Sequence, residues 1–301
     1  MRVLARNDPE WTGADIAFER YTAGEDPTPS ADVVLDTIAF DEGDIARCDP
    51  DHIGRLIAVS SASVYVDYTG RTLDEPAENG FPDLPDPIPE EQLTVRPGPE
   101  TYSTRKVRME QAAQGAFGPR ATILRPCAIH GPYSRHPREW WFVNRIKDRR
   151  RTIPLAFDGE SVFHTTSAGS LGRLTAFLAD HELGGVWNAA DDDAPSVREI
   201  GRAIAAHFGK RIRFYGMDGP PRSSVGRTPW SISKPFMVDT GKAIDAGFEG
   251  FGRYADGIAT YIDWLRGVPA EGWRTAFPQL AAYPWDMFDY AAEDRFFDEQ
   301  H

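Results

Sequence analysis

The chain has 301 residues, a net charge of −13 and 41% hydrophobic residues, which is enough apolar material for a sizeable core. This acidity excludes nucleic acid as a partner, because binding a polyanion requires clustered Lys and Arg. The one basic run, KDRRR at 147–151, predicts either a solvated helix end or an anchor for an anionic group such as phosphate. No apolar run approaches the ~20 residues of a membrane span, so no membrane partner is expected.

The cysteine content and the N-terminus indicate the compartment. Cys48 and Cys127 are too few for a disulfide framework and lack the spacing of metal ligands, so a reducing environment without a metal site is expected. The start of the chain, MRVLARNDPEW, lacks the apolar stretch of a signal peptide. The sequence therefore predicts a cytoplasmic protein.

Short apolar strands alternate with helical stretches, which predicts an α/β protein with a parallel sheet covered on both faces. Each predicted strand is nearly continuous in apolar residues, as strands buried on both faces are. The predicted strands are 2–5, 32–38, 56–61, 121–126 and 185–190. The predicted helices are 101–117, 167–181 and 196–209. The last has Ser196 as N-cap, Glu199 as its capping partner and Gly209 as its stop.

Three segments lack this alternation. Segment 74–99 is rich in proline and acids, and predicts a long surface loop over the mouth of the site. Segment 216–235 is rich in Gly, Pro and Ser and predicts a second loop. The aromatic and acidic tail 271–301 predicts an arm that packs on the body or on another subunit.

The pair Tyr102 and Lys106 carries the clearest chemistry. A spacing of four at the start of a helix puts both side chains on one face. A tyrosine with a pKa near ~10 is a poor base at neutral pH, but a neighbouring ammonium favours the phenolate and lowers that pKa. Ser61 ends the strand 56–61, where open parallel sheets bind ligands, so its hydroxyl is expected to hold the substrate oxygen.

Ordered segments around this pair resemble the extended short-chain dehydrogenases/reductases, the NAD-dependent epimerase/dehydratase family, over residues 31 to about 265. SSASVY resembles the strand with the catalytic Ser, and TYSTRK the helix with the catalytic Tyr and Lys. DVVLDTIAF is similar to the strand and loop beside the adenine, LRPCAIHGP to the segment lining nicotinamide and substrate, and SVFHTTSAGSLGRL to the stretch leading into a late helix.

The resemblance implies a catalytic role for three residues. Tyr102 would be the acid/base, Lys106 would lower its pKa and contact the nicotinamide ribose, and Ser61 would orient the reacting oxygen. The implied cofactor is NAD or NADP, and the implied partner is a small-molecule substrate. A dimer through the helices that flank the tyrosine is common in the family, and the sequence leaves the oligomeric state of this chain open.

The resemblance also implies binding roles for further residues. Thr37 and Ala39 would approach the cofactor, and Pro126 to Ile129 would line its nicotinamide end. Further candidates for substrate contact are Ser63, His130, Asn144 and His164. For His164 a structural role is an equal alternative.

The implied fold is a Rossmann-like, doubly wound parallel sheet with a smaller C-terminal substrate lobe. On this basis residues 1–160 form the nucleotide-binding lobe, 161–270 complete the sheet and form the substrate lobe, and 271–301 form the arm. The N-terminal unit of this sheet is expected to be truncated or degenerate.

The chain departs from the family where a glycine-rich turn should hold the cofactor's pyrophosphate. One alignment leaves Asn7 and Glu10 where glycines belong, with only Gly13 in place. The other, which we prefer, treats 2–6 as the family's second strand, ending in Arg6, which suits a 2′-phosphate. The first strand, glycine loop and first helix are then missing. A coding start assigned too late would also produce this gap.

Three functions are consistent with these features. The first is an NAD(P)-dependent oxidoreductase or epimerase acting on a hydroxyl-bearing small molecule such as a nucleotide sugar. The second is a cofactor-independent isomerase, lyase or cyclase that uses Ser61, Tyr102 and Lys106. The third is a non-catalytic binding protein on the same fold, which the aromatic tail and missing loop would suit.

Overall fold

A computed structural model describes residues 1–8, 15–26, 28, 30–74 and 80–300. The chain forms two compact units, each assembled from separated stretches of sequence. The first unit comprises Met1–Ser60, Arg96–Leu124 and Leu178–Gly185. The second comprises Ser61–Val95, Arg125–Phe177 and Val186–His301. The division of the chain predicted from the sequence, into 1–160, 161–270 and 271–301, stays a prediction.

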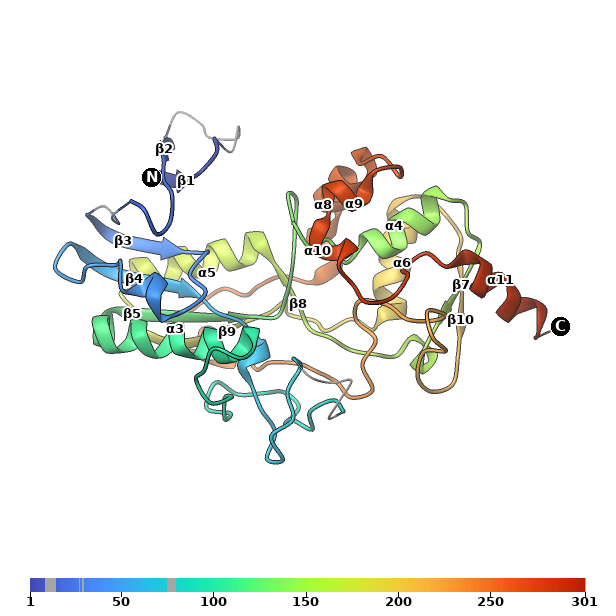
Figure 1. The fold of residues 1–301 in the computed structure, drawn as a ribbon, viewed down its shortest axis with the longest axis horizontal. Helices are drawn as coiled ribbons and strands as arrows, with labels where there is room; N and C mark the ends of the chain where they lie inside the picture. Colours follow the sequence, from blue (N-terminus) through green and yellow to red (C-terminus); the bar gives the residue numbers. More distant parts are fainter. Residues whose placement is uncertain (9–14, 27, 29, 75–79, 301) are drawn as a thin grey trace. The chain divides into compact units, whose positions relative to one another are not determined.

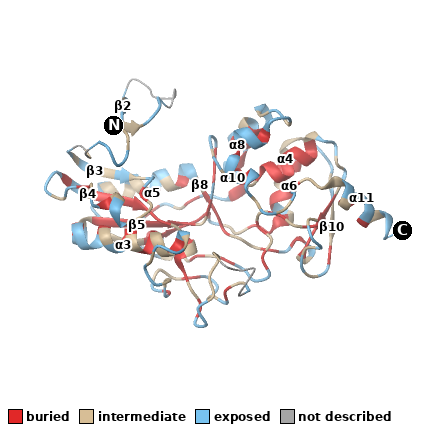
Figure 2. Cartoon of the chain, in the orientation of Figure 1, coloured by how far each residue is buried: buried red, intermediate tan, exposed pale blue. Residues whose placement is uncertain are grey.

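The main sheet has the strand order β3-β4-β5-β9 (Figure 1). The parallel strands β3 (Ala31–Asp36), β4 (Ile53–Val59) and β5 (Ala121–Pro126) pair in turn, and β9 (Gly185–Ala189) begins at the last residue of the first unit. Strands β4 and β5 are buried along almost their whole length, as their continuous apolar sequences predict (Figure 2). The predicted parallel sheet is confirmed.

The N-terminal strand lies outside this sheet. Strand β1 (Arg2–Ala5) pairs in parallel with β2 (Ala17–Arg20), which the sequence analysis missed, in a separate two-stranded sheet. The strand predicted at 2–5 is confirmed, but its expected place in the main sheet is wrong, because β1 is paired with β2 instead. Glu10 and Gly13, on which one alignment depended, lie outside the described residues.

Strand β3 consequently lies at the edge of the main sheet. Among the strands that the structure describes, β4 is the one that pairs with it. Val33 and Leu35 on β3 are 37% and 45% exposed. This edge therefore faces water, which avoids the cost that unpaired backbone groups incur when they are buried.

Helix α3 (Tyr102–Phe117) begins with a complete capping box between Thr101 and Thr104. It ends at Gly118, whose φ of 54° suits a glycine. Its buried side chains include Val107 and Phe117, and α1 (Glu42–Ile45) packs against it. The cap at the start fixes the orientation of the turn that carries the predicted Tyr102–Lys106 pair.

The second unit holds two further parallel strand pairs and most of the helices. Strand β6 (Ala128–His130) pairs with β8 (Thr165–Ser167), and β7 (Thr152–Leu155) pairs with β10 (Arg213–Gly216). Its helices are α4 (Trp140–Lys147), α6 (Val197–His207), α7 (Gly241–Asp245), α8 (Tyr254–Gly267), α9 (Trp273–Ala276), α10 (Pro278–Ala281) and α11 (Tyr290–Asp298). Helix α5 (Ala168–Asp180) runs from the second unit into the first.

Helices α4, α6 and α8 surround the core of the second unit, and the C-terminal arm completes it. Trp140 and Trp141 of α4 are fully buried there, and Trp273, Phe277 and Leu280 of the arm are buried in the same core. Figure 2 shows α4 coloured as buried. The tail thus packs on the body of its own chain, which was one of the two predicted outcomes.

The first of the predicted loops lacks regular secondary structure, as expected. In the described part of 74–99, the chain forms turns and isolated bridges rather than helices or strands. The buried carboxylate of Asp67 organises the start of this region by accepting hydrogen bonds from Arg71 and from the backbone N–H of Asp83. Burial alone would raise the pKa of Asp67, but these hydrogen bonds outweigh it and lower that pKa.

Candidate active site

Lys106 is the best-defined residue of the predicted site. It lies on the buried face of α3 and is only 6% exposed. Its Nζ donates to the carbonyl oxygen of Ala39 at 2.7 Å and to that of Val59 at 2.9 Å. Ala39 follows β3 and Val59 ends β4, so the ammonium joins the carboxyl ends of two neighbouring strands, where open parallel sheets bind ligands.

Tyr102 occupies the first turn of the same helix and is 46% exposed. The Nζ of Lys106 lies 5.8 Å from the centroid of the Tyr102 ring. The centroid of the Phe40 ring lies 5.5 Å from that of Tyr102. The predicted i,i+4 pair is therefore brought together, with one member accessible and the other buried. Ala39, which is also a predicted site residue, contributes its backbone carbonyl as an acceptor for Lys106.

Burial lowers the pKa of Lys106 from 10.5 to about 8, because removing an ammonium from water disfavours its charged form. Three carboxylates, Asp36, Glu110 and Asp44, oppose this shift through their negative charge. Lys106 is therefore charged at neutral pH, and it loses its charge in the mildly alkaline range.

The free energy of unfolding is expected to rise between about pH 8 and 10.5, because there the unfolded chain binds a proton at Lys106 that the folded chain has released. Below that pH window Lys106 is charged in both the folded and the unfolded chain, so the folded chain bears the full free-energy cost of burying the ammonium. The gain is on the order of 3 kcal/mol. Denaturant titrations of the wild type and of Lys106→Met at pH 7 and pH 10 measure it as a difference. Equal pH dependence in the two proteins would contradict the lowered pKa.

Two other predicted residues of the first unit lie at the surface. Thr37 is exposed in the turn after β3, directly after Asp36. Arg6 is exposed after β1, and its carbonyl accepts from the Nε of Arg20 at 3.1 Å. Their proposed contacts with a cofactor stay predictions.

Ser61 belongs to the second unit, where it caps a short 3₁₀ turn, Ala62–Val64, by accepting from the backbone N–H of Ser63 at 3.2 Å. Ser61 and Ser63 are both partly exposed. Pro126 is buried at the end of β5, whereas Ile129 of β6 is 38% exposed. These roles also remain predictions.

The two predicted histidines meet at one aspartate, Asp191, which the sequence analysis did not single out. The Nε2 of His130 lies 2.8 Å from Oδ2 of Asp191, and both side chains are at most 2% exposed. The Nε2 of His164 donates to the backbone carbonyl of Asp191 at 2.8 Å. Its Nδ1 accepts from the N–H of Val238 at 3.3 Å, which defines a neutral ring.

The protonation of this cluster follows from its partners. Burial alone would lower the pKa of His130, but the hydrogen bond and charge of Asp191 raise it. Burial alone would raise the pKa of Asp191, but the hydrogen bond from His130 lowers it. Burial lowers the pKa of His164. A buried ion pair and a neutral histidine, each bonded within the protein, favour structural roles over substrate contact.

Asn144 lies elsewhere in the second unit, on α4, and is 4% exposed. Its Nδ2 donates to Oδ2 of Asp148 at 2.9 Å and to the hydroxyl of Tyr290 at 3.4 Å. It is therefore part of the contact between α4 and the C-terminal arm, which also favours a structural role.

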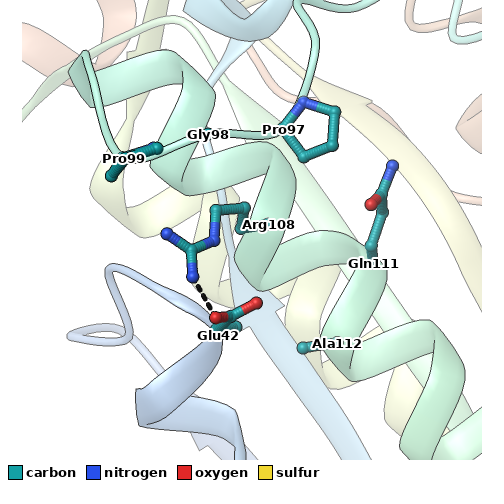
Figure 3. A pocket seen from close by; sticks show the side chains of 7 residues that line it. All are labelled: Glu42, Pro97, Gly98, Pro99, Arg108, Gln111 and Ala112. Carbon is teal, nitrogen blue, oxygen red and sulfur yellow. Dashed lines mark hydrogen bonds and ion pairs between the residues drawn. The ribbon is translucent and has the colours of Figure 1, made fainter.

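An open pocket of about 550 Å³ lies beside α3, on the helix face opposite to Lys106 (Figure 3). Arg108 and Glu42 form an ion pair at its wall. Its lining residues are Glu42, Pro97, Gly98, Pro99, Arg108, Gln111 and Ala112, none of them a predicted site residue. The described residues contain no group of His, Cys, Asp and Glu suited to a metal ion, and no described helix is long and apolar enough to cross a membrane.

Comparison with protein-family models and with curated proteins gives no match. Solved structures do match. An NAD-dependent NDP-hexosamine 5,6-dehydratase of tunicamycin biosynthesis, TunA, aligns with a TM-score of 0.62 and 17% identity over 89% of this chain and 90% of its own. DesIV, the dTDP-glucose 4,6-dehydratase of Streptomyces venezuelae, aligns with a TM-score of 0.61 and 18% identity over 93% and 89%.

The UDP-glucuronic acid 4-epimerase of Bacillus cereus gives a TM-score of 0.60 and 16% identity over 83% of this chain and 82% of its own. At these identities the likeness establishes the fold. The parallel sheet agrees with it, so the predicted fold class is confirmed. The chain has a Rossmann-like α/β fold, similar to that of the matched epimerase and dehydratase structures.

Proposed function

We propose that this protein is an NAD(P)-dependent epimerase, dehydratase or reductase acting on a hydroxyl-bearing small molecule, with a nucleotide sugar as the leading substrate class. The observation that carries the proposal is the accessible Tyr102 beside the buried ammonium of Lys106. The matched structures support it, because on a similar fold the Bacillus cereus epimerase is in complex with NAD and a UDP-sugar, and DesIV has NAD bound.

The chemistry of the pair is proton transfer. The charge of Lys106 favours the phenolate of Tyr102, so the tyrosine exchanges a proton with a substrate hydroxyl or carbonyl near neutral pH. Ser61 would hold the same substrate oxygen. A bound nicotinamide would supply the matching hydride chemistry at the substrate carbon.

The residues fit one end of such a cofactor. Lys106 uses two of its three N–H donors on Ala39 and Val59, which leaves a third for a ribose hydroxyl or for Tyr102. At the diphosphate end the sequence departs from the family's glycine-rich turn, and no helix begins in the described residues between β1 and β2. A helix N-terminus is the usual anion site in this fold. We therefore expect weak cofactor binding that depends on Lys106.

Titration of the protein with NAD, NADH, NADP and NADPH tests the proposal directly. We expect saturable binding of at least one of them, weakened in Lys106→Met because the ribose contact is lost. No binding of any of the four at millimolar concentration would overturn the proposal. Thr37→Ala, a change in the exposed turn after β3, is the comparison variant. We expect it to weaken cofactor binding less than Lys106→Met does.

The departure of the sequence from the family's glycine-rich phosphate motif favours a second candidate, a cofactor-independent proton transfer by Tyr102, Lys106 and Ser61, such as an isomerisation or elimination. Turnover in a nicotinamide-free preparation that is lost in Tyr102→Phe would favour this function over the first. Turnover that requires added nicotinamide would exclude it.

A further inference from the structure

Lys106 is held between two strand ends, and each of these ends is fixed by a carboxylate. On one side, Oδ1 of Asp36 accepts from the backbone N–H groups of Ile38 at 2.8 Å and Ala39 at 2.7 Å. These bonds close the turn after β3 and orient the Ala39 carbonyl that accepts from Lys106.

On the other side, Glu110 fixes the end of β4. Its Oε1 accepts from the hydroxyl of Ser60 at 2.5 Å, and both side chains are 3% exposed. Ser60 directly follows Val59, whose carbonyl is the second acceptor for Lys106. Glu110 also lies one helical turn after Lys106 on α3, so the two side chains share a face.

The same two carboxylates supply negative charge to a desolvated ammonium. The charged groups that act on Lys106 are Asp36 of β3, Glu110 of α3 and Asp44 of α1. Asp44 is itself paired with Arg47 at 2.6 Å, which balances its charge. Asp36 and Glu110 therefore combine two properties: each fixes a strand end that holds Lys106, and each acts on its charge. Asp44 also acts on this charge and accepts from the backbone N–H of Phe40 at 2.7 Å, but it differs from them in its pairing with Arg47.

We propose that Asp36 and Glu110 are positioning residues that keep Lys106 protonated and hold it beside Tyr102 by fixing the two strand ends that carry its carbonyl acceptors. The consequence for turnover rests on the proposed function. The effect on Lys106 itself does not, because it follows from charges and hydrogen bonds within the first unit.

The experiment is an NMR titration of Lys106 in protein labelled with ¹³C-lysine. The chain has five lysines, and Lys106→Met identifies the signal of Lys106 by its disappearance. Glu110→Gln keeps an oxygen acceptor for Ser60, and Asp36→Asn keeps the acceptor of the turn, so each change removes charge while retaining the hydrogen bonds. We expect each to lower the pKa of Lys106 by about one unit, a tenfold shift in protonation.

Glu42→Gln is the matched control, because Glu42 lies on neighbouring α1 but pairs with Arg108. We expect it to leave the titration of Lys106 unchanged. An unchanged pKa of Lys106 in both Asp36→Asn and Glu110→Gln would overturn the inference. Asp36 is only partly buried, so Asp36→Asn is expected to fold and decides the question even if Glu110→Gln does not.

Turnover gives a second readout that a merely structural role would not move. In the folded variants the alkaline limb of the kcat profile is expected to shift to lower pH by the same amount as the pKa of Lys106, with little change in KM. If the wild type has no activity while the pKa of Lys106 shifts as expected, the proposed function is wrong and the positioning role stands.

Discussion

Replacing Tyr102 by Phe is expected to lower kcat by about 10²–10⁴-fold, the usual contribution of a positioned acid or base. The change removes one hydroxyl from a side chain that is 46% exposed, so we expect the fold to persist. The ring of Phe40, 5.5 Å away, would still pack against the new phenyl ring. Steady-state kinetics on a panel of nucleotide sugars, with and without added nicotinamide, measures the effect.

The comparison variant for this experiment is Tyr68→Phe. Tyr68 is 84% exposed and lies in the second unit, outside the predicted site. The Tyr68→Phe protein is expected to retain full activity. That result would show that the loss of an exposed tyrosine hydroxyl does not by itself lower turnover. Wild-type turnover in the Tyr102→Phe protein would show that proton transfer does not pass through this tyrosine, under either candidate function.

The Tyr102–Lys106 pair was predictable because its geometry is local. Spacing along one helix places the two side chains together, and the capping residues Thr101 and Thr104 mark where that helix begins. The predicted strands of the main sheet were recognisable for a similar reason, since each is a short apolar run bounded by polar residues. The sequence therefore predicted the fold class and the centre of the candidate site.

The acids around Lys106 escaped prediction because they depend on tertiary packing. Asp36 and Glu110 are 74 positions apart in the numbering of the chain, and they meet Lys106 only because β3, β4 and α3 pack together. One signal was present: Glu110 lies four residues after Lys106 on a helix. Asp191 was missed for the same reason, because its partners His130 and His164 come from distant strands and loops.

The N-terminal pairing and helix α4 were missed for other reasons. Strand β2 has four residues, three of them exposed and two of those charged, so no apolar pattern marks it. In α4, seven of the eight residues are buried, so its sequence, WWFVNRIK, lacks the polar face by which an amphipathic helix is recognised. Short or fully enclosed elements are defined by their neighbours, which a single sequence does not reveal.

That enclosure makes α4 the anchor of the C-terminal arm. Arg145 of α4 is 1% exposed, and its Nη2 donates to Oε1 of Glu293 at 2.6 Å and to the carbonyl of Met287 at 2.8 Å. Its guanidinium carbon lies 3.5 Å from the centroid of the Trp141 ring. A single buried charge thus joins the helix to two points on the arm.

Replacing Arg145 by Met is therefore expected to lower the free energy of unfolding by about 3–5 kcal/mol, because it leaves Glu293 buried without its main partner. Arg150, 3.5 Å from Glu293, would compensate only in part. Denaturant unfolding followed by tryptophan fluorescence measures the loss. The double variant Arg145→Met with Glu293→Leu should recover most of it, because an apolar pair carries no uncompensated charge.

Arg150→Met is the control for this cycle. Arg150 is 19% exposed and contacts the exposed Asp294, so its loss is expected to cost less than about 1 kcal/mol. If Arg145→Met were as mild as Arg150→Met, the buried ion pair would not be what holds the arm, and the aromatic packing of Trp273 and Phe277 against the core would be sufficient. A large loss that the double variant restores would instead assign the attachment of the arm to the pairing of Arg145 with Glu293.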